Sequence, residues 1–235
     1  MIVAIHQPQY LPWLAYVSKA DSGDVFVYLD NVQFQKNGVQ NRNQIKAADG
    51  AMWLTVPVHA HLHRSIAETE IAGNQWMEKH LRAIALNYAK AEHFKRYRNE
   101  LETLLRREWK SLAELNIAVT EWLFTAMEIS CKRVRASELK VEGKGEELIL
   151  NMCQKLGAKT YLSGQGAKAY QDPQKFRERG IELRYQSYEP VAYRQCHMKR
   201  GFISGLSALD AILNIGDAAR ELINRTEKSR VGRGA

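Results

Sequence analysis

A dense set of chemically capable side chains occupies residues 6–13 of the sequence. The segment follows a short β-branched run at residues 2–5 and holds two prolines that stiffen the backbone. An imidazole titrates near neutral pH, and His6 is therefore a candidate general base. A lone histidine is more often a hydrogen-bonded core residue, but the many donors at one strand end favour a site. The residues expected to bind a substrate here are Gln7, Gln9, Tyr10 and Trp13.

A second polar segment covers residues 30–46 and follows a predicted strand at residues 25–29. It is rich in amide side chains, which can hydrogen-bond a sugar or a base, and its cations can bind phosphate or carboxylate. The same composition also suits a solvated turn. The candidate binding residues of this segment are Asp30, Gln33, Lys36, Asn41, Arg42 and Lys46.

A glycine-containing turn follows another predicted strand, at residues 160–162. Glycines allow backbone N–H groups to approach an oxyanion at the start of a helix. The spacing matches neither the Walker pattern nor Gly-x-Gly-x-x-Gly, so this turn by itself is equally an ordinary connection between a strand and a helix. Its candidate binding residues are Ser163, Gly164 and Gly166.

Metal and nucleophile chemistry has weaker support in the sequence. His59, His61 and His63 alternate after a strand, but their spacing fits no familiar structural zinc pattern, and we predict no metal site. Cys196 and His197 are adjacent, and neighbouring residues of a strand point to opposite sides. A catalytic pair of these two side chains is therefore not expected.

The elements that must position these side chains follow an alternation of strands and helices. Strands at residues 2–5 and 25–29 enclose a predicted helix that begins near Pro12, and this βαβ unit implies parallel strands with a right-handed crossover. Because the carboxyl ends of parallel strands lie at one edge of a sheet, the three polar segments should converge on one cleft. Further strands are predicted at residues 134–136, 160–162 and 181–185, and further helices at 146–156 and from about 207 to 216.

Two segments depart from this alternation. Short runs around Asp49 and Gly50 predict a β-hairpin, and residues 76–130 lack glycine and proline and show the apolar spacing of three helices. We therefore predict an α/β fold. Its mostly parallel, Rossmann-like or HUP-like sheet carries a β-hairpin and an α-helical insertion at about residues 75–130.

The basic excess of the chain lies in its C-terminal part. The net charge is +8, and residues 1–130 carry equal numbers of basic and acidic side chains. Residues 225–235 are predicted to form a basic flexible tail after a single α/β domain at residues 1–224. Elsewhere the excess is dispersed and is not interleaved with aromatic side chains. This pattern favours an anionic small molecule as the partner and argues against nucleic acid.

The apolar pattern and the cysteines bear on the compartment. No run reaches the roughly 18 apolar residues that a membrane span needs, and the first residues lack the basic region of a signal peptide. We therefore expect a cytoplasmic protein without a membrane span. The three cysteines are widely spaced, so no disulfide framework is expected, and no particular oligomeric state is favoured.

Several motifs of the sequence resemble the WbqC-like protein family. They span nearly the whole chain, from His6 to Gly216, and the basic tail falls outside the resemblance. The first blocks are long and unusual, which makes the resemblance specific. The matching motifs are His6-Gln7-Pro8-Gln9-Tyr10-Leu11-Pro12-Trp13, residues 24–30, Gln33-Phe34-Gln35-Lys36, residues 40–46, residues 53–58, Tyr161-Leu162-Ser163-Gly164 with Gly166-Ala167 and Tyr170, Tyr193-Arg194-Gln195, and Leu206-Ser207-Ala208-Leu209-Asp210 with Asn214-Ile215-Gly216.

The resemblance implies a substrate class. WbqC-like proteins are associated with bacterial cell-surface polysaccharide genes, particularly O-antigen synthesis beside enzymes that make nucleotide-linked amino sugars. The implied activity is a transferase that acylates or aminoacylates the amino group of a nucleotide-linked sugar. Such a step needs a base, cations or N–H groups for the diphosphate and the oxyanion, and a stacking surface. These roles would be taken by His6, by Lys36 with Arg42, and by Tyr10 with Trp13.

A weaker similarity of layout to HUP-type nucleotidylyltransferases and pantothenate-synthetase-like ligases leaves two alternatives open. Those enzymes hold nucleotide phosphates at the end of the first strand, but their His-x-Gly-His signature is absent, since residues 11–14 read Leu-Pro-Trp-Leu. Nucleotidyl transfer or adenylate formation is the second interpretation. A non-catalytic module that binds a nucleotide-linked sugar is the third. A nucleotide is the one cofactor that these interpretations suggest.

Overall fold

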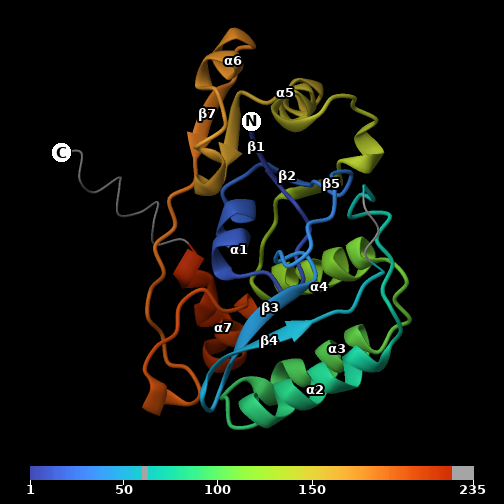
Figure 1. Ribbon diagram of the computed structural model, residues 1–235. Helices are drawn as coiled ribbons and strands as arrows, with labels where there is room; N and C mark the ends of the chain where they lie inside the picture. Colours follow the sequence, from blue (N-terminus) through green and yellow to red (C-terminus); the bar gives the residue numbers. More distant parts are fainter. Residues whose placement is uncertain (60–62, 224–235) are drawn as a thin grey trace, which may run out of the picture.

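The computed structural model describes residues 1–59 and 63–223. His61 and the predicted basic tail at residues 225–235 lie outside the described residues. Figure 1 shows a central sheet with helices on both of its faces and a larger, mainly helical part below it.

The central sheet has five strands in the order β5-β2-β1-β6-β7. Every pairing in it is parallel, which confirms the predicted α/β fold with a mostly parallel sheet. In the middle strand, Val3 pairs with Val25 on one side and with Tyr161 on the other. The chain therefore builds the sheet outward from β1 in both directions, and the order reverses between β1 and β6. The strands are β1 (Ile2–His6), β2 (Val25–Tyr28), β5 (Lys132–Arg135), β6 (Thr160–Ser163) and β7 (Glu182–Tyr185).

The first two strands are largely apolar, except for His6 at the end of β1, because both of their faces are covered. Val3 and Val27 belong to a cluster on one face, while Ala4 and Phe26 belong to the larger core on the other face. Side chains alternate between the faces of a strand, so each of these short runs contributes to both cores.

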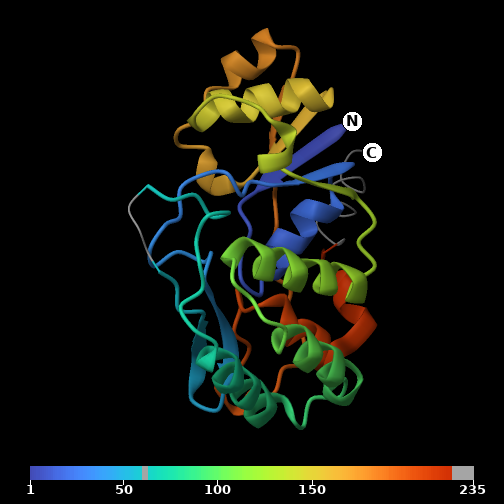
Figure 2. The same ribbon diagram turned by 90° about the vertical axis from the view of Figure 1, so that its right-hand side faces the viewer.

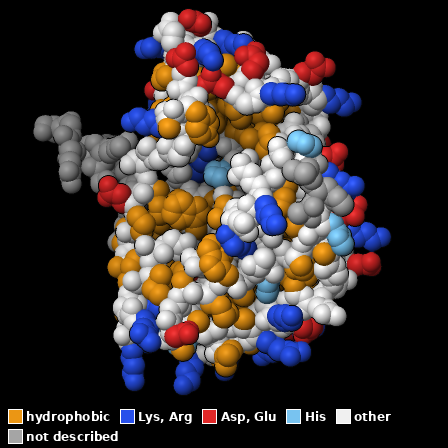
Figure 3. Space-filling model, in the orientation of Figure 1, with side chains coloured by type: hydrophobic (Ala, Val, Ile, Leu, Met, Phe, Trp, Pro, Cys, Tyr) orange, Lys and Arg blue, Asp and Glu red, His pale blue; other side chains and the backbone are white. Residues whose placement is uncertain are grey.

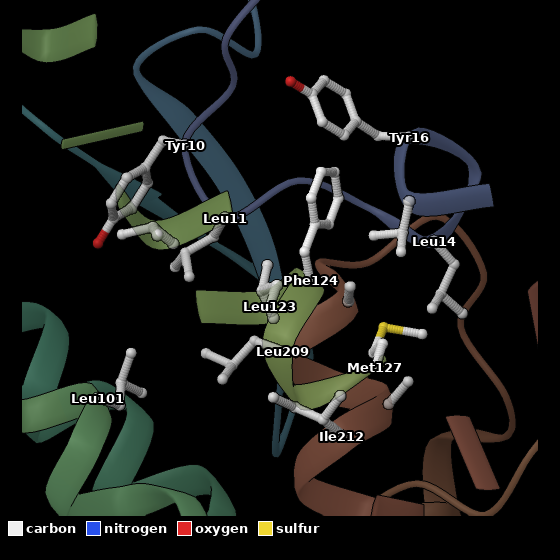
Figure 4. Close-up of a cluster of buried hydrophobic side chains, with 14 of the residues drawn as sticks. Tyr10, Leu11, Leu14, Tyr16, Leu101, Leu123, Phe124, Met127, Leu209 and Ile212 are labelled. Atoms are coloured by element: carbon white, nitrogen blue, oxygen red, sulfur yellow. The ribbon is translucent and has the colours of Figure 1, made fainter. Parts of the chain in front are cut away.

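Helices supply the layers on the two faces (Figure 2). On one face α5 contributes Leu148 and Met152, and α6 contributes Phe176, to the smaller cluster. On the other face, side chains of α1, α4 and α7 meet in the larger core, including Tyr16, Phe124 and others (Figure 4). No helix of the described ranges is long and apolar enough to cross a membrane. The helices are α1 (Leu14–Asp21), α2 (Gln75–Tyr88), α3 (Phe94–Leu105), α4 (Leu112–Ala126), α5 (Gly145–Leu156), α6 (Pro173–Glu178) and α7 (Ala208–Ile215).

The predicted hairpin and helical insertion are both present. Strands β3 (Arg42–Ala47) and β4 (Gly50–Thr55) pair antiparallel, and the three expected helices are α2, α3 and α4. The hairpin was expected to turn around Asp49 and Gly50, whereas Gly50 already pairs with Ala47 and only Ala48 and Asp49 form the loop. Gly50 has a φ of 141°, a backbone conformation that residues with a Cβ rarely adopt, so the glycine is needed just after the loop.

Four short 3₁₀ helices complete the described part: η1 (Ser137–Leu139), η2 (Gln165–Ala167), η3 (Met198–Arg200) and η4 (Gly216–Ala218). Of these, η2 follows β6 directly and η1 follows β5, so both stand at the carboxyl edge of the sheet.

Candidate functional site

A pocket of about 490 Å³ lies at the carboxyl ends of β1 and β6. These are the two strands between which the strand order reverses, and open parallel sheets commonly bind ligands at that position. The face shown in Figure 3 is hollowed between its upper and lower parts. The polar residues that line the pocket are His6, Gln7, Lys19, Gln35, Glu146, Ser163, Tyr170 and Gln171, and the glycines are Gly145, Gly164 and Gly166.

His6 is the last residue of β1 and is half-buried at the pocket. Its Nδ1 atom lies 3.2 Å from the backbone carbonyl oxygen of Gln7. A carbonyl can only accept a hydrogen bond, so Nδ1 carries the proton and Nε2 keeps a free lone pair. Burial and the nearby charge of Lys19 lower the pKa of His6 to about 3. The imidazole is therefore neutral at physiological pH and can act as an acceptor through Nε2.

Lys19, in α1, places a buried amino group against the pocket. The side chain is only 2% exposed, and Nζ donates a 2.7 Å hydrogen bond to the backbone oxygen of Ile5. No ion pair within residues 1–59 and 63–223 involves this lysine. Burial lowers its pKa to about 7. A buried cation without a carboxylate partner is costly, and a pocket beside it can provide a ligand anion as the partner.

The opposite wall of the pocket comes from β6, η2 and the start of α5. Ser163 is buried and donates a 2.8 Å hydrogen bond to Oε1 of Gln171. A Cβ atom built on Gly164 or Gly166 would meet nothing within 4 Å, so packing does not demand glycine there. Glu146 is already engaged, because it accepts hydrogen bonds from Lys175 and from a backbone N–H.

Five of the residues proposed from the sequence come together in this pocket: His6, Gln7, Ser163, Gly164 and Gly166. The expected convergence of strand ends thus holds for β1 and β6. Segment 30–46 contributes Val32 and Gln35 to the pocket, neither of which was among the candidates.

Three candidates of that segment lie elsewhere at the sheet edge. Asp30 is buried and accepts hydrogen bonds from the backbone N–H and the hydroxyl of Ser137, at 2.9 and 2.7 Å. It thereby fixes the start of η1 to the end of β2. Gln33 and Lys36 are exposed, and Gln33 forms an isolated backbone bridge with Ser65.

The three remaining candidates of the segment are at or in the hairpin. Asn41 donates to the backbone oxygen of Val56 at 2.8 Å. The Arg42 guanidinium donates to the backbone oxygen of Asn37 and lies 4.5 Å from the ring centre of Trp53. Lys46 is fully buried and donates to Oε1 of Gln195 at 2.9 Å, far along the chain.

The remaining candidates of residues 6–13 have structural surroundings. Tyr10 is fully buried with its hydroxyl 2.9 Å from Nδ1 of His80, and burial raises its pKa. Gln9 is buried as well. Trp13 precedes α1 and is partly exposed, with its ring 6.1 Å from that of Tyr188. None of these three side chains lines the pocket.

A second buried polar cluster surrounds Asp210 of α7. Its carboxylate is fully buried and accepts hydrogen bonds from the hydroxyls of Tyr88 and Tyr193, both at 2.6 Å, and from the amide of Gln195 at 2.9 Å. Burial raises the pKa of Asp210, although these hydrogen bonds oppose the shift. The cluster connects α2, α7 and the chain segment before α7, which is a structural role.

Metal and thiol chemistry finds no support in the described geometry. Within residues 1–59 and 63–223, no group of three or more His, Cys, Asp or Glu side chains could hold a metal ion. Burial raises the pKa of the Cys196 thiol, which favours the unreactive protonated form.

Several polar pocket residues were not among those proposed from the sequence, namely Lys19, Gln35, Glu146, Tyr170 and Gln171. Lys19 could have been noticed in the sequence, because a lysine among the apolar residues of a short helix must either be buried or extend its amine out of the core. Gln171 could not, because it lies in an irregular segment between η2 and α6.

Comparisons with known proteins agree with the resemblance seen in the sequence. The model of the WbqC-like protein family matches residues 7–222. The uncharacterized protein Rv1507c of Mycobacterium tuberculosis is 32% identical over 225 residues, which cover 94% of this chain and 96% of that protein. Of the pocket residues at the end of β1, Gln7, which follows the strand, lies inside the matched span, and His6 directly precedes that span.

Proposed function

The chain belongs to the WbqC-like protein family, and on this basis we propose that it is a transferase of bacterial cell-surface polysaccharide biosynthesis. In this proposal it acylates or aminoacylates the amino group of a nucleotide-linked sugar. The observation that carries the proposal is the buried Lys19 amino group. It lies beside the pocket, has no carboxylate partner among residues 1–59 and 63–223, and is close to His6 in the same lining.

The anionic part of the ligand has a natural counter-charge in this pocket. A diphosphate would supply a negatively charged partner for the Lys19 amine. Because the amine is buried, its attraction to the diphosphate is stronger than it would be at a solvated surface. The same anion would raise the pKa of Lys19 and keep it charged. Lys19 therefore takes the role that the sequence suggested for Lys36 and Arg42.

His6 has the state that an acyl transfer to an amine requires. In the step, the amine nitrogen forms a bond to the acyl carbon, the bond to the donor's leaving group breaks, and one amine proton must leave. Nε2 of the neutral imidazole can take that proton. A bound diphosphate would favour the resulting imidazolium and so move the pKa of His6 upward from about 3.

A ring or base of the ligand also needs an apolar surface. Tyr10 and Trp13 do not reach the pocket, whereas Tyr170 lines it and is 75% exposed. An exposed aromatic ring at the edge of a pocket suits stacking on a nucleotide base. Tyr170 is the stacking residue of this proposal.

The strand order supports a second candidate function. With β1 in the centre and the reversal at β6, the sheet follows the order in which doubly wound proteins bind nucleotides at the switch point. A nucleotidylyltransferase or adenylate-forming ligase would use the same pocket for a nucleoside triphosphate. A module that binds without catalysis would use it for the nucleotide-linked sugar alone.

The test is a product screen by mass spectrometry. Purified protein is incubated with nucleotide-linked amino sugars and acyl or aminoacyl donors, and separately with a sugar phosphate and nucleoside triphosphates. Acylated product in the first set supports the transferase. Pyrophosphate release only in the second set replaces it with nucleotidyl transfer, and tight binding without any product leaves the binding module.

A further inference from the structure

A buried glutamine behind the pocket, Gln40, makes a directed chain of hydrogen bonds. The backbone N–H of Gln35 donates to Oε1 of Gln40 at 2.7 Å, and Nε2 of Gln40 donates to Oε1 of Gln7 at 2.8 Å. Gln40 is only 2% exposed. Its backbone oxygen accepts from the side chain of Asn116 and from the backbone N–H of Tyr10, so the residue is held from several sides.

The direction of this chain is fixed by its first member. A backbone N–H can only donate, so the atom of Gln40 that faces Gln35 must be the oxygen. The amide nitrogen of Gln40 then faces Gln7, and Gln7 must meet it with its own oxygen. The group that Gln7 has left for the pocket is its NH₂, which is a donor.

His6, the neighbour of Gln7, has the opposite kind of hydrogen-bonding group to offer. Because Nδ1 of His6 donates to the carbonyl of Gln7, the ring atom that His6 has left for a ligand is the acceptor Nε2. The end of β1 thus offers one acceptor and one donor from consecutive residues, and both residues line the same pocket.

We propose that Gln40 is a positioning residue that turns the amide of Gln7 toward the pocket as a donor, and that the pocket thereby selects a secondary amide. Such a group has an N–H for His6 and a carbonyl for Gln7. A free ammonium has no acceptor for the NH₂ of Gln7. The inference deepens the proposed function and rests on it, since the acylated sugar carries this amide and the oxyanion that precedes it also accepts hydrogen bonds.

The decisive variant is Gln40→Glu, which has the same shape but no donor. The carboxylate would accept from Gln35 and from Gln7, so Gln7 must turn its NH₂ away from the pocket and present its oxygen. Gln75→Glu is the matched control, because it makes the same substitution at an exposed position at the start of α2. Gln40→Leu removes the chain of hydrogen bonds without reversing it.

The first measurement needs no ligand. Side-chain amide protons of Gln7 are identified by NMR through their absence in Gln7→Leu, and their exchange with water is measured. In the wild type the Gln7 amide should exchange fast and the Gln40 amide slowly, and in Gln40→Glu the Gln7 amide should become protected. Unchanged Gln7 exchange in Gln40→Glu, with a folded spectrum, would refute the positioning role.

The second measurement is calorimetric binding of two probes, uridine diphosphate N-acetylglucosamine and uridine diphosphate glucosamine. The wild type and Gln75→Glu should prefer the amide by about 3- to 10-fold, the value of one hydrogen bond. Gln40→Leu should lose that preference and Gln40→Glu should reverse it. Equal weakening of both probes would show a merely structural role and contradict the inference. If the NMR result holds but the wild type binds neither probe, the positioning role stands and the proposed sugar substrate fails.

Discussion

At the scale of single residues, His6 and Lys19 each keep an interaction open for a ligand. Lys19 has a neutral backbone oxygen where buried lysines usually have a carboxylate, and His6 has a donor bond on Nδ1 that leaves Nε2 open. Both groups lose charge by burial, and both would recover it beside an anion. Their proximity makes the affinity of the pocket sensitive to the charge of its ligand.

Lys19→Met should abolish most binding of a nucleotide diphosphate and raise stability. Removing a buried, unpaired cation should stabilise the fold by on the order of 1–3 kcal/mol at pH 6. The folded-state pKa of Lys19 is about 7, below that of the unfolded chain, so the unfolded state holds more protons above pH 7. Wild-type stability should therefore gain on the variant as the pH rises from 7 to 10. Urea unfolding of both proteins across that pH range measures the difference in their stability. A difference that stays constant with pH would contradict the prediction.

His6→Ala should lower kcat by roughly 10²–10⁴-fold with little change in affinity for the free amino sugar, as expected when a general base is lost. Thermal unfolding separates this outcome from a packing role, because replacing a core histidine would lower stability and activity together.

The same histidine predicts that acid lowers the stability of the protein. Since burial lowers its pKa to about 3, the unfolded chain binds the extra proton first, and stability should fall between about pH 6.5 and 3. The loss of stability on acidification should be smaller in His6→Ala than in the wild type.

Arg42→Lys serves as the contrasting surface variant. Arg42 lies over the ring of Trp53 and outside the pocket lining, so a nucleotide-linked sugar should bind the variant and the wild type equally. Titration calorimetry on both proteins is sufficient. A loss of affinity would show that the hairpin contributes to the ligand site after all.

At the scale of elements, the carboxylate of Asp30 helps to fasten the end of β2 to the turn after β5, beside a backbone hydrogen bond from Ala136 to Tyr28. Asp30→Ala should cost about 1–3 kcal/mol of stability, because the backbone N–H and the hydroxyl of Ser137 lose a charged acceptor at a partly buried contact. Ligand affinity should stay the same, since Asp30 does not line the pocket. Chemical denaturation and calorimetry on one variant check both statements, and lost affinity at normal stability would return Asp30 to the binding site.

The elements themselves were largely readable from the sequence, and the reason is local. Runs such as residues 25–28 carry their own apolar pattern, and the helices of the insertion carry theirs. The surroundings of Lys46 were not readable, because its burial depends on Gln195 and on the carbonyl of Gly201, more than a hundred residues away. For the same reason the sequence placed His6 and Ser163 at the site but not Lys19, whose orientation depends on how α1 packs under β1.

At the scale of the whole molecule, the buried carboxylate of Asp210 ties together parts that are distant in the chain. It binds Tyr88 of α2 and Tyr193 of the segment before α7, while Lys46 of the hairpin shares Gln195 with it. Asp210→Ala should destabilise the fold by roughly 2–5 kcal/mol, since several buried donors lose one acceptor. Hydrogen exchange should rise in β3 and β4 together with the end of α2. Exchange that rises in α7 alone would contradict this linkage.

The central position of β1 has a consequence for synthesis of the chain on the ribosome. β1 can pair with β2 after about thirty residues, but its other edge, at residues 2–4, waits for β6. An apolar strand with an open edge invites pairing with foreign strands. The nascent chain therefore exposes this edge while the whole helical insertion is being made, and the two walls of the pocket meet only when residues 160–171 have emerged. Nascent chains that stop before β6 should accordingly be the ones that chaperones retain.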